Sequence, residues 1–374
     1  MVIVLRRGRV RIALAALILL VFAAGGGLWY AGVAAVDANE KEGEKSFIKW
    51  VDFNVSYEAL DRALCLDIES HDGDTPLNWV ELLAVYAAKN GGEFRGFKTA
   101  KLDDIAEKLR SGQSIEELTK DLKYYPYYRE AYGAVLDGLV GEYEAEVPDP
   151  SAPGGKKWET KYGLKGYSPI AKNYPYNDFD DFGTSRDYGF KRKHLGHDLM
   201  GAVGTPIIAV EGGTVEALGW NQYGGWRIGI RSFDQKRYYY YAHLRKNFPY
   251  NTQLEVGSVV QPGDVIGYLG RTGYSANENV NNITQPHLHF GLQLIFDESQ
   301  KEGNNEIWVD VYPLVRLLYR HRSEVVKNEE TKEYSRIYDI RDPAVPDGAP
   351  RPDNAVAQPT TAATIPTGTT TASG

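Results

Sequence analysis

Between residues 205 and 295 the chain is a succession of short runs rich in strand-forming residues, and this feature limits the fold more than any other. Clusters of Gly, Pro, Asn and Asp, which favour turns, separate the runs. The runs are TPIIAV (205–210), GTVEAL (213–218), WRIGIRSF (226–233), KRYYYYAHL (236–244), DVIGYLG (264–270) and HLHFGLQLI (287–295). Such spacing is typical of an antiparallel barrel or sandwich. We therefore expect a β domain, with a closing amphipathic helix in PLVRLLYRHRSEVV (313–326).

Other parts of the chain have different patterns. Residues 45–145 place apolar residues at helical spacing, with a Gly pair after LNWVELLAVYAAKN and a capping-box pattern at Ser114 and Glu117. The composition of EVPDPSAPGGKKWE (146–159) is typical of a linker. The predicted class is α+β multidomain. It comprises a transmembrane helix within residues 1–40, a small all-α domain over 41–147, the antiparallel β domain over 148–332 and a disordered Pro/Thr/Ala-rich tail over 333–374.

The N-terminal residues predict where the protein acts. Four arginines between positions 6 and 11 precede an apolar run over residues 12–36. A run of this length can span a ~30 Å hydrocarbon core, and the arginines favour a cytoplasmic start. We expect a single-pass anchor in the cell membrane with the C-terminal domains outside. The alternative is a cleaved signal peptide, with Val33-Ala34-Ala35 as the cleavage site, and a secreted protein.

Charge and cysteine content exclude several classes of function. The net charge of −8 argues against nucleic-acid binding, which usually requires a basic face. Cys65 is the only cysteine, so the chain has no internal disulfide and no cysteine-based metal site. Any metal ligands must therefore be His, Asp or Glu.

Two histidines lie one residue apart in a predicted strand. On a strand, His287 and His289 point to the same face with Cα atoms ~6.6 Å apart. His194 and Asp198 form a second pair, four residues apart, and Gly196 between them allows the bend that would turn both side chains inward. Two histidines and one carboxylate, with a fourth position open, describe a catalytic zinc site.

Only three protein ligands are needed, so one histidine of this group remains for chemistry. His243, at the end of the run YYYYAHL, is a further candidate. The chain has no HExxH glutamate, so histidines must act as the general base. His197 lies next to Asp198 in the sequence, so on a strand its side chain would point to the opposite face. We therefore interpret His197 as structural.

At these residues the sequence resembles the lysostaphin-like zinc endopeptidases, which cut peptide bonds in bacterial peptidoglycan. The motifs are HLGHD, GTPIIAVEGGTV, YAHL, VGSVVQPGDVIGYLGRTG and HLHF, in this order over about 194–294. The resemblance implies zinc bound by His194, Asp198 and His289, with His243 and His287 as the catalytic pair. It also implies a substrate-binding role for Tyr188, which would steady the transition state. The implied fold is a barrel-sandwich of the duplicated hybrid motif type.

Two features depart from the family pattern. The Asn-rich segment 274–286 takes the place of a short loop before HLHF, and we expect it to border the catalytic histidines and influence substrate choice. Gly291 follows HLHF where many relatives carry a glutamate or glutamine.

Three alternative functions are compatible with parts of the sequence. One is a catalytically silent envelope scaffold of the same fold, and another is a bifunctional hydrolase whose helical domain cuts glycan with Glu81 as the acid. The third is a lipoyl- or biotinyl-type carrier, which needs a lysine on a hairpin tip. No lysine lies between Lys246 and Lys301, which argues against the carrier.

Overall fold

The computed structural model describes residues 47–187, 191–303 and 305–357. The chain from Ile48 onward forms one compact unit. The predicted anchor at residues 12–36 lies outside the described residues, as does Tyr188. Within the described ranges, no helix combines the length and apolarity needed to cross a bilayer.

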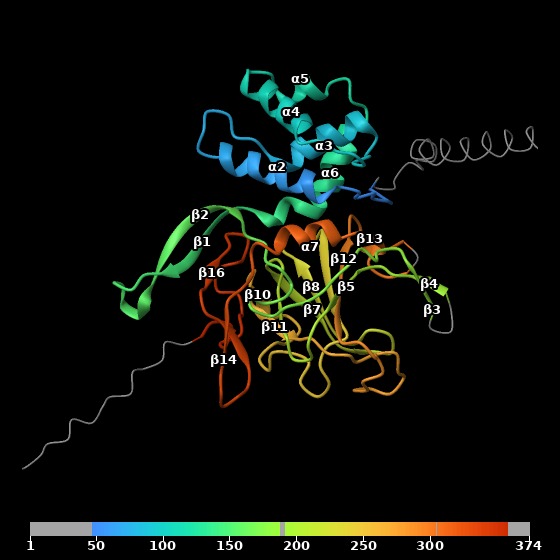
Figure 1. Cartoon of the computed structure of the whole chain (residues 1–374), viewed down its shortest axis with the longest axis vertical. Helices are drawn as coiled ribbons and strands as arrows, with labels where there is room; N and C mark the ends of the chain where they lie inside the picture. The colour runs from blue at the N-terminus through green and yellow to red at the C-terminus, as the bar shows by residue number, and fades with distance from the viewer. Residues whose placement is uncertain (1–46, 188–190, 304, 358–374) are drawn as a thin grey trace, which may run out of the picture. The chain divides into compact units, whose positions relative to one another are not determined.

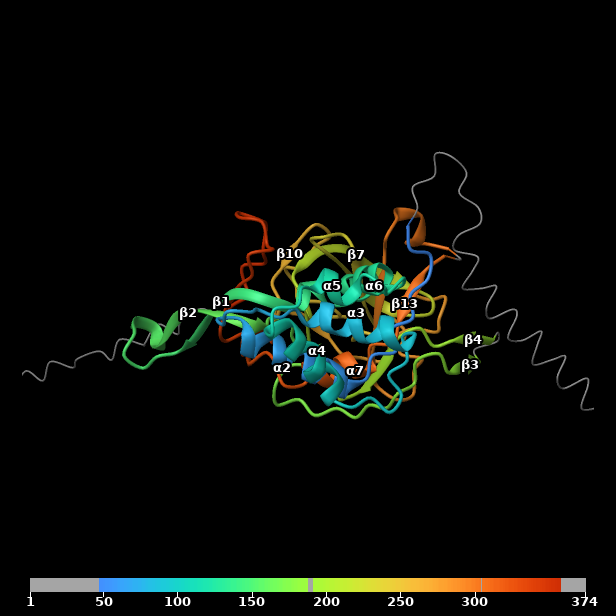
Figure 2. The same ribbon diagram turned by 90° about the horizontal axis from the view of Figure 1, so that it is seen from above.

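The helical part confirms the helices expected from the sequence. Asn78 caps α3, Gly91 ends it in the left-handed conformation, and Ser114 and Glu117 form a reciprocal capping box at α5. These helices lie together in Figures 1 and 2. They are α2 (Tyr57–Ser70), α3 (Trp79–Asn90), α4 (Ala100–Arg110), α5 (Ile115–Thr119) and α6 (Tyr125–Leu136), with a 3-10 turn at Asp137–Leu139.

The segment interpreted as a linker is instead a β-hairpin. Strands β1 (Val140–Pro148) and β2 (Lys156–Leu164) pair over their full length. A 3-10 turn at Pro153–Gly155 closes the hairpin, with Gly154 at φ 79°. Pro and Gly are common in both linkers and tight turns, so composition alone misassigned the segment. The domain boundary predicted between residues 147 and 148 falls inside β1.

An antiparallel sheet that includes seven strands carries the candidate site. All six predicted runs form strands. The main path runs β10 (Val259–Val260), β7 (Gly213–Asn221), β8 (Gly225–Ser232), β9 (Arg237–Ala242), β12 (His287–Leu294) and β13 (Ile307–Val309), and β5 (His197–Met200) pairs with the first half of β12. Strands β6 (Pro206–Ile208) and β11 (Val265–Tyr268) form a separate pair. A mostly β domain with a small helical region is thus confirmed, whereas the duplicated hybrid motif stays a prediction.

The C-terminal segment is ordered further than its composition predicts. Residues 333–357 were expected to belong to a disordered tail, but Arg336 is 1% exposed and Arg351 binds Asp264 at 2.6 Å. The buried Arg336 and the partly exposed Arg351 hold this segment against the β domain. The remaining elements are β3 (Ser185–Asp187), β4 (Lys191–Lys193), a 3-10 turn at Glu298–Gln300, α7 (Tyr312–Leu318), β14 (Val325–Lys327), β15 (Tyr334–Arg336) and β16 (Ile340–Arg341), which pairs with β1.

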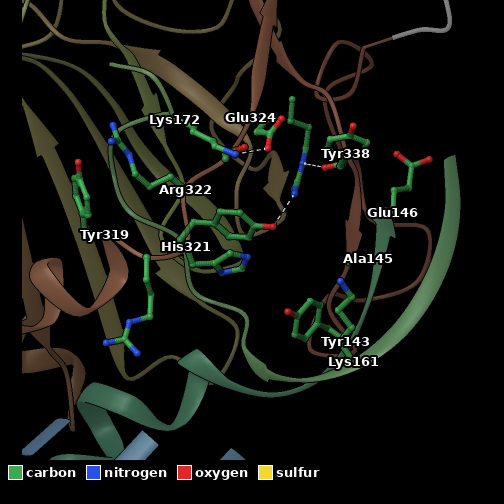
Figure 3. Close-up of a pocket in the computed structure, with 14 residues that line it drawn as sticks. Tyr143, Ala145, Glu146, Lys161, Lys172, Tyr319, His321, Arg322, Glu324 and Tyr338 are labelled. Carbon is green, nitrogen blue, oxygen red and sulfur yellow. Dashed lines mark hydrogen bonds and ion pairs between the residues drawn. The ribbon is translucent and has the colours of Figure 1, made fainter. Parts of the chain in front are cut away.

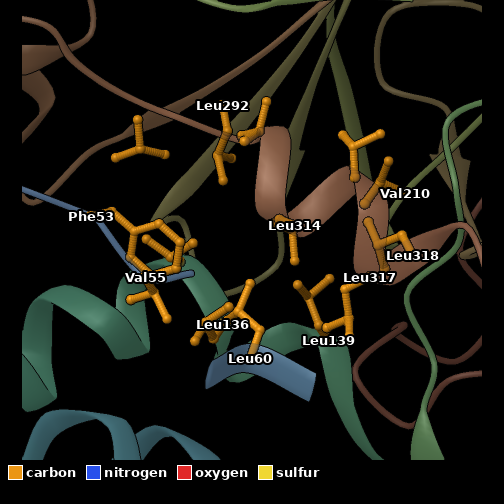
Figure 4. Packing of buried hydrophobic residues seen from close by; sticks show 14 of the residues in the cluster. Phe53, Val55, Leu60, Leu136, Leu139, Val210, Leu292, Leu314, Leu317 and Leu318 are labelled. Atoms are coloured by element: carbon orange, nitrogen blue, oxygen red, sulfur yellow. The ribbon is translucent and has the colours of Figure 1, made fainter. Parts of the chain in front are cut away.

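One contiguous apolar core joins the helices to the sheet. Leu60 of α2 and Leu136 of α6 are fully buried, as are Leu314 and Leu317 of α7. Figure 4 shows these side chains meeting between the helices and the strands. A buried Arg237 adds a polar link, because its guanidinium donates to the Ala134 carbonyl at 2.9 Å. The helical segment is therefore packed onto the β scaffold that carries the site.

Candidate metal centre and catalytic histidines

Strand register brings Asp198 and His289 together. β5 and β12 run antiparallel, and Asp198 is the direct partner of His289. Directly opposed side chains share one face of the sheet. Asp198 Oδ1 lies 3.1 Å from His289 Nδ1, so both atoms can reach one ion.

His194 completes the cluster from the turn between β4 and β5. Its Nε2 lies 3.0 Å from Asp198 Oδ1 and 2.9 Å from His289 Nδ1. Gly196 gives the ring of His289 room, because a Cβ at this position would lie 2.6 Å from two of its ring atoms. The three ligand atoms thus converge from two strands and a turn.

The donor set fits a zinc ion. Zinc bonds of ~2.0–2.1 Å to nitrogen and oxygen place tetrahedral ligand atoms about 3.3 Å apart. The three atoms here are 2.9–3.1 Å apart, so a small outward shift would admit the ion. His194 and Asp198 are buried, at 5% and 6% exposure, which shields the ion's bonds from water. Three protein ligands leave a fourth position for a reactant.

Asp181 orients His194, and sequence reasoning missed it. Its main-chain oxygen and its Oδ2 lie 3.1 and 3.2 Å from His194 Nδ1. Arg186 donates to Asp181 Oδ2 at 2.6 Å and to Asp198 Oδ2 at 3.1 Å. A carboxylate behind a metal-binding histidine fixes the tautomer that presents Nε2 to the metal. The acidic run NDFDDFG (177–183) was the available signal.

The protonation of this cluster follows from its carboxylates. Burial opposes the charged form of His194, but the hydrogen bonds that its ring donates to Asp181 and Asp198 outweigh burial and raise its pKa to about 9. Burial likewise opposes ionisation of Asp181, yet His194 and His197 lower its pKa below the ordinary range. A bound metal would compete with the proton on His194, so metal affinity should fall as pH falls.

His197 points away from the ligand atoms, in agreement with its structural interpretation. Its Nε2 lies 3.0 Å from Asp178 Oδ2, and its ring packs edge-on against Tyr312. Asp181 Oδ1 is 3.5 Å from the other ring nitrogen. His197 therefore lies beside Asp181, and its hydrogen bond is to Asp178.

His243 and His287 lie beside the cluster with matching orientations. His243 Nδ1 contacts the Thr272 carbonyl at 2.9 Å, and His287 Nδ1 contacts the Gln285 carbonyl at 2.8 Å. Because a carbonyl can only accept, each Nδ1 must carry the hydrogen, and each Nε2 is left as the reactive nitrogen. The two rings are 4.8 Å apart between centroids, and His287 Nε2 lies 3.8 Å from Asp198 Oδ1.

His243 is held in a neutral form. It follows β9 with φ 63°, a conformation that non-glycine residues rarely adopt and that is often found at functional sites. Burial lowers its pKa well below the usual value, and the nearby His287 and His289 lower it further. A neutral imidazole with a free Nε2 can accept a proton.

The Asn-rich segment 274–286 borders the site, as its position in the sequence predicts. The ring of Tyr274 lies 5.6 Å from that of His243. Asn279 fastens the segment to the scaffold, because its Oδ1 accepts from Trp226 Nε1 at 2.9 Å and from the Asn247 main chain at 2.8 Å. This segment therefore forms one wall beside His243.

Gly291 has a steric reason to be glycine in this chain. A Cβ there would lie 2.7 Å from the ring of Trp308. Trp308 in turn packs edge-on against Tyr240, which contacts His289 in the same manner. An aromatic pair thus occupies the space beside Gly291.

The scaffold and the site together define a class: a β domain with a His-Asp-His metal cluster and two histidines beside it, as in metallopeptidases. Residues 192–330 match the model of Peptidase family M23. This part of the chain is an M23 domain, and metallopeptidases of that family use zinc.

Relatives of known activity match this domain and some flanking sequence. The chain is 35% identical over 159 residues to an L-Ala–D-Glu endopeptidase of Bacillus subtilis, covering 42% of this chain and 45% of the relative. It is 40% identical over 98 residues to lysostaphin of Staphylococcus simulans, covering 26% and 17%. The matches thus span less than half the length of these relatives.

Among solved structures, a Ruminococcus gnavus lytM protein is similar with 24% identity and a TM-score of 0.48, over 74% of this chain and 92% of that one. The catalytic domain of Staphylococcus simulans lysostaphin is similar with 31% identity and a TM-score of 0.30, over 38% and 92%.

Proposed function

We propose that the chain is a zinc-dependent endopeptidase that hydrolyses peptide bonds in the stem or cross-link peptides of peptidoglycan. One observation carries the proposal: His194, Asp198 and His289 converge within 4.8 Å, and two further histidines present Nε2 beside them. A silent scaffold would have no need of this full set. The names of the relatives, an L-Ala–D-Glu endopeptidase and lysostaphin, support the substrate class.

The two catalytic histidines take different roles. Zinc, when bound, supplies Lewis-acid chemistry that acidifies water and polarises a carbonyl. His243 is neutral and buried, so its Nε2 accepts the proton of the attacking water. The partner must donate to the developing oxyanion, which requires a protonated ring because its Nδ1 hydrogen is already engaged. His287, with Asp198 Oδ1 at 3.8 Å, is suited to that role.

The place of action is outside the cytoplasm. The arginines between positions 6 and 11 and the apolar run over 12–36 support export, either as a single-pass anchor or as a cleaved signal. Peptidoglycan lies on the same side of the membrane as the domains that follow. The M23 domain would then meet its polymer directly.

Digestion of purified peptidoglycans that differ in their cross-bridges tests the proposal. New amino and carboxyl ends, identified by mass spectrometry, should appear with zinc and disappear with a chelator. His194→Ala is the inactive control, and it should also lose stoichiometric zinc by elemental analysis. Binding to every polymer without release of any fragment would instead support the silent scaffold.

A further inference from the structure

A cavity lies away from the residues of the metal site. It has a volume of about 360 Å³, which is in the range of small-ligand pockets. Figure 3 shows its walls, which come from the β1–β2 hairpin, the segment after α7 and the C-terminal strands. Three separate stretches of chain thus meet around one polar opening.

Stacked rings form the floor of this cavity. His321 stacks on Tyr167 with centroids 3.8 Å apart, and its Nδ1 contacts the Gly166 carbonyl at 3.0 Å. The hydrogen is therefore on Nδ1. Burial lowers the pKa of His321 to about 4, and the charges of Arg336 and Lys161 contribute. His321 thus has a neutral ring whose Nε2 can only accept a hydrogen bond.

More cationic than acidic residues line the cavity, although the whole chain is acidic. Its lining includes five cationic residues and two acidic ones: Lys161, Lys172, Arg320, Arg322 and Arg336 against Glu146 and Glu324. Both acids are neutralised by partners, since Glu324 binds Lys172 at 2.6 Å and Glu146 binds Lys156 at 3.1 Å. Arg320 and Arg336 are also paired, with Asp61 at 2.6 Å and Asp264 at 3.4 Å, so Arg322 and Lys161 are the lining cations without a close carboxylate in the described part of the chain.

Most of the cations are already occupied by the protein. Arg322 donates to three main-chain carbonyls, Arg336 donates to the Pro262 and Tyr338 carbonyls, and Arg320 binds Asp61 at 2.6 Å. Lys161 differs, because its nearest carboxylate oxygen, on Glu159, is 3.9 Å away.

Tyr143 faces Lys161 across the hairpin as its direct strand partner. Its hydroxyl has no hydrogen-bond partner anywhere in the described ranges of the chain, and the same holds for His321 Nε2. Three groups around one cavity are thus available to a ligand: an ammonium, a phenol and a ring acceptor.

We propose that this cavity binds the carboxyl end of a peptide. Lys161 and the Tyr143 hydroxyl donate to the two carboxylate oxygens, and His321 Nε2 accepts the amide N–H of the terminal residue. A phosphate group is less suited, because it would need more donors than one ammonium and one phenol, and the guanidinium groups are engaged. Resting on the proposed function, the cavity is an anchoring site for free stem peptides of the same polymer that the M23 domain cuts.

A binding experiment tests the cavity without depending on catalysis. The probe is N-acetyl-alanyl-alanine, titrated into chelator-treated protein while the ring signals of His321 are followed by NMR. We expect saturable shifts with the free acid and binding weaker by ~10-fold or more with the carboxamide, because the charge-assisted hydrogen bond is lost. Equal binding of acid and amide would overturn the proposal, as would tighter binding of inorganic phosphate.

Matched variants test whether the free acid binds at the residues of the cavity. Lys161→Met should weaken binding of the acid ~10-fold or more, and Tyr143→Phe should weaken it by a smaller factor. Lys157→Met is the control, because it removes the same charge from β2 at a residue that does not line the cavity. Equal loss in both lysine variants would show a general effect of charge and refute the site.

A second measurement tests whether the cavity anchors the protein to peptidoglycan. Lys161→Met should release fewer fragments from intact peptidoglycan than the unmodified chain but cleave a short soluble peptide at the same rate, because anchoring helps only a multivalent substrate. If the unmodified chain cleaves neither substrate, the proposed function fails while the NMR titration still reports on the cavity. Equal release from intact peptidoglycan by both proteins would remove the anchoring role.

Discussion

Replacing Asp181 by asparagine should weaken zinc binding without removing any ligand. Asp181 Oδ2 lies 3.2 Å from His194 Nδ1 and 2.6 Å from Arg186. The asparagine keeps the shape and the main-chain acceptor but loses the negative charge. Arg186 would then have Asp198 as its nearest carboxylate, at 3.1 Å, and would compete with the metal for it.

The size of this effect follows from the role of the carboxylate. Loss of the partner behind a metal-binding histidine typically costs ~10–100-fold in metal affinity, equivalent to ~1.4–2.7 kcal/mol. Because the Asp181 main-chain oxygen remains at 3.1 Å from His194 Nδ1, we expect the lower half of this range. Competition for zinc with a chromophoric chelator measures the affinity directly.

Asp178→Asn provides the matched control. Asp178 binds His197 Nε2 at 3.0 Å, so it shares a neighbour with Asp181 but contacts none of the three expected ligands. Thermal melts of both variants in excess chelator separate a loss of metal binding from a loss of folding. The reasoning is refuted if Asp181→Asn binds zinc as tightly as the unmodified chain, or if Asp178→Asn loses as much affinity.

The remaining predictions concern catalysis, substrate choice and the steric fit around His289. His243→Ala and His287→Ala should keep zinc and lose turnover by ~10²–10⁴, the usual contribution of proton transfer, and near-normal rates would contradict their roles. Shortening segment 274–286 within residues 276–283 should preserve zinc content and change which cross-bridge is cut, so unchanged rates on a cross-bridge panel would count against it. Gly196→Ala should abolish zinc binding, because the added Cβ would lie 2.6 Å from the ring of His289. Elemental analysis measures the zinc content of this variant, and full occupancy would contradict the prediction.

The strands and the meeting of the ligands could be predicted because both depend on simple periodicities. Alternation along HLHF places His287 and His289 on one face, where residues of a neighbouring strand can meet them. The register that pairs Asp198 with His289 is not encoded in either segment alone. It follows from the β4–β5 turn and the packing of the whole sheet.

Asp181 illustrates what local patterns leave out. It lies in NDFDDFG, a run with three aspartates and no periodicity to distinguish one from another. Its role depends on a long-range contact with His194, thirteen positions away. The composition of 146–159 and 333–357 was equally ambiguous, because Pro and Gly are used in tight turns and in packed irregular segments as well as in disordered ones.

The orientation of the catalytic histidines links chemistry to the inserted segment. The Thr272 carbonyl that holds His243 comes just before segment 274–286, and the Gln285 carbonyl that holds His287 belongs to its last residues. Both reactive nitrogens are therefore aimed by main-chain atoms at the two ends of one loop. The middle of that loop can vary to suit a substrate only while its ends stay fixed, and the bonds of Asn279 to Trp226 and Asn247 limit how far it can shift. We therefore expect changes in the middle of segment 274–286 to alter substrate choice while the geometry of the two histidines is kept.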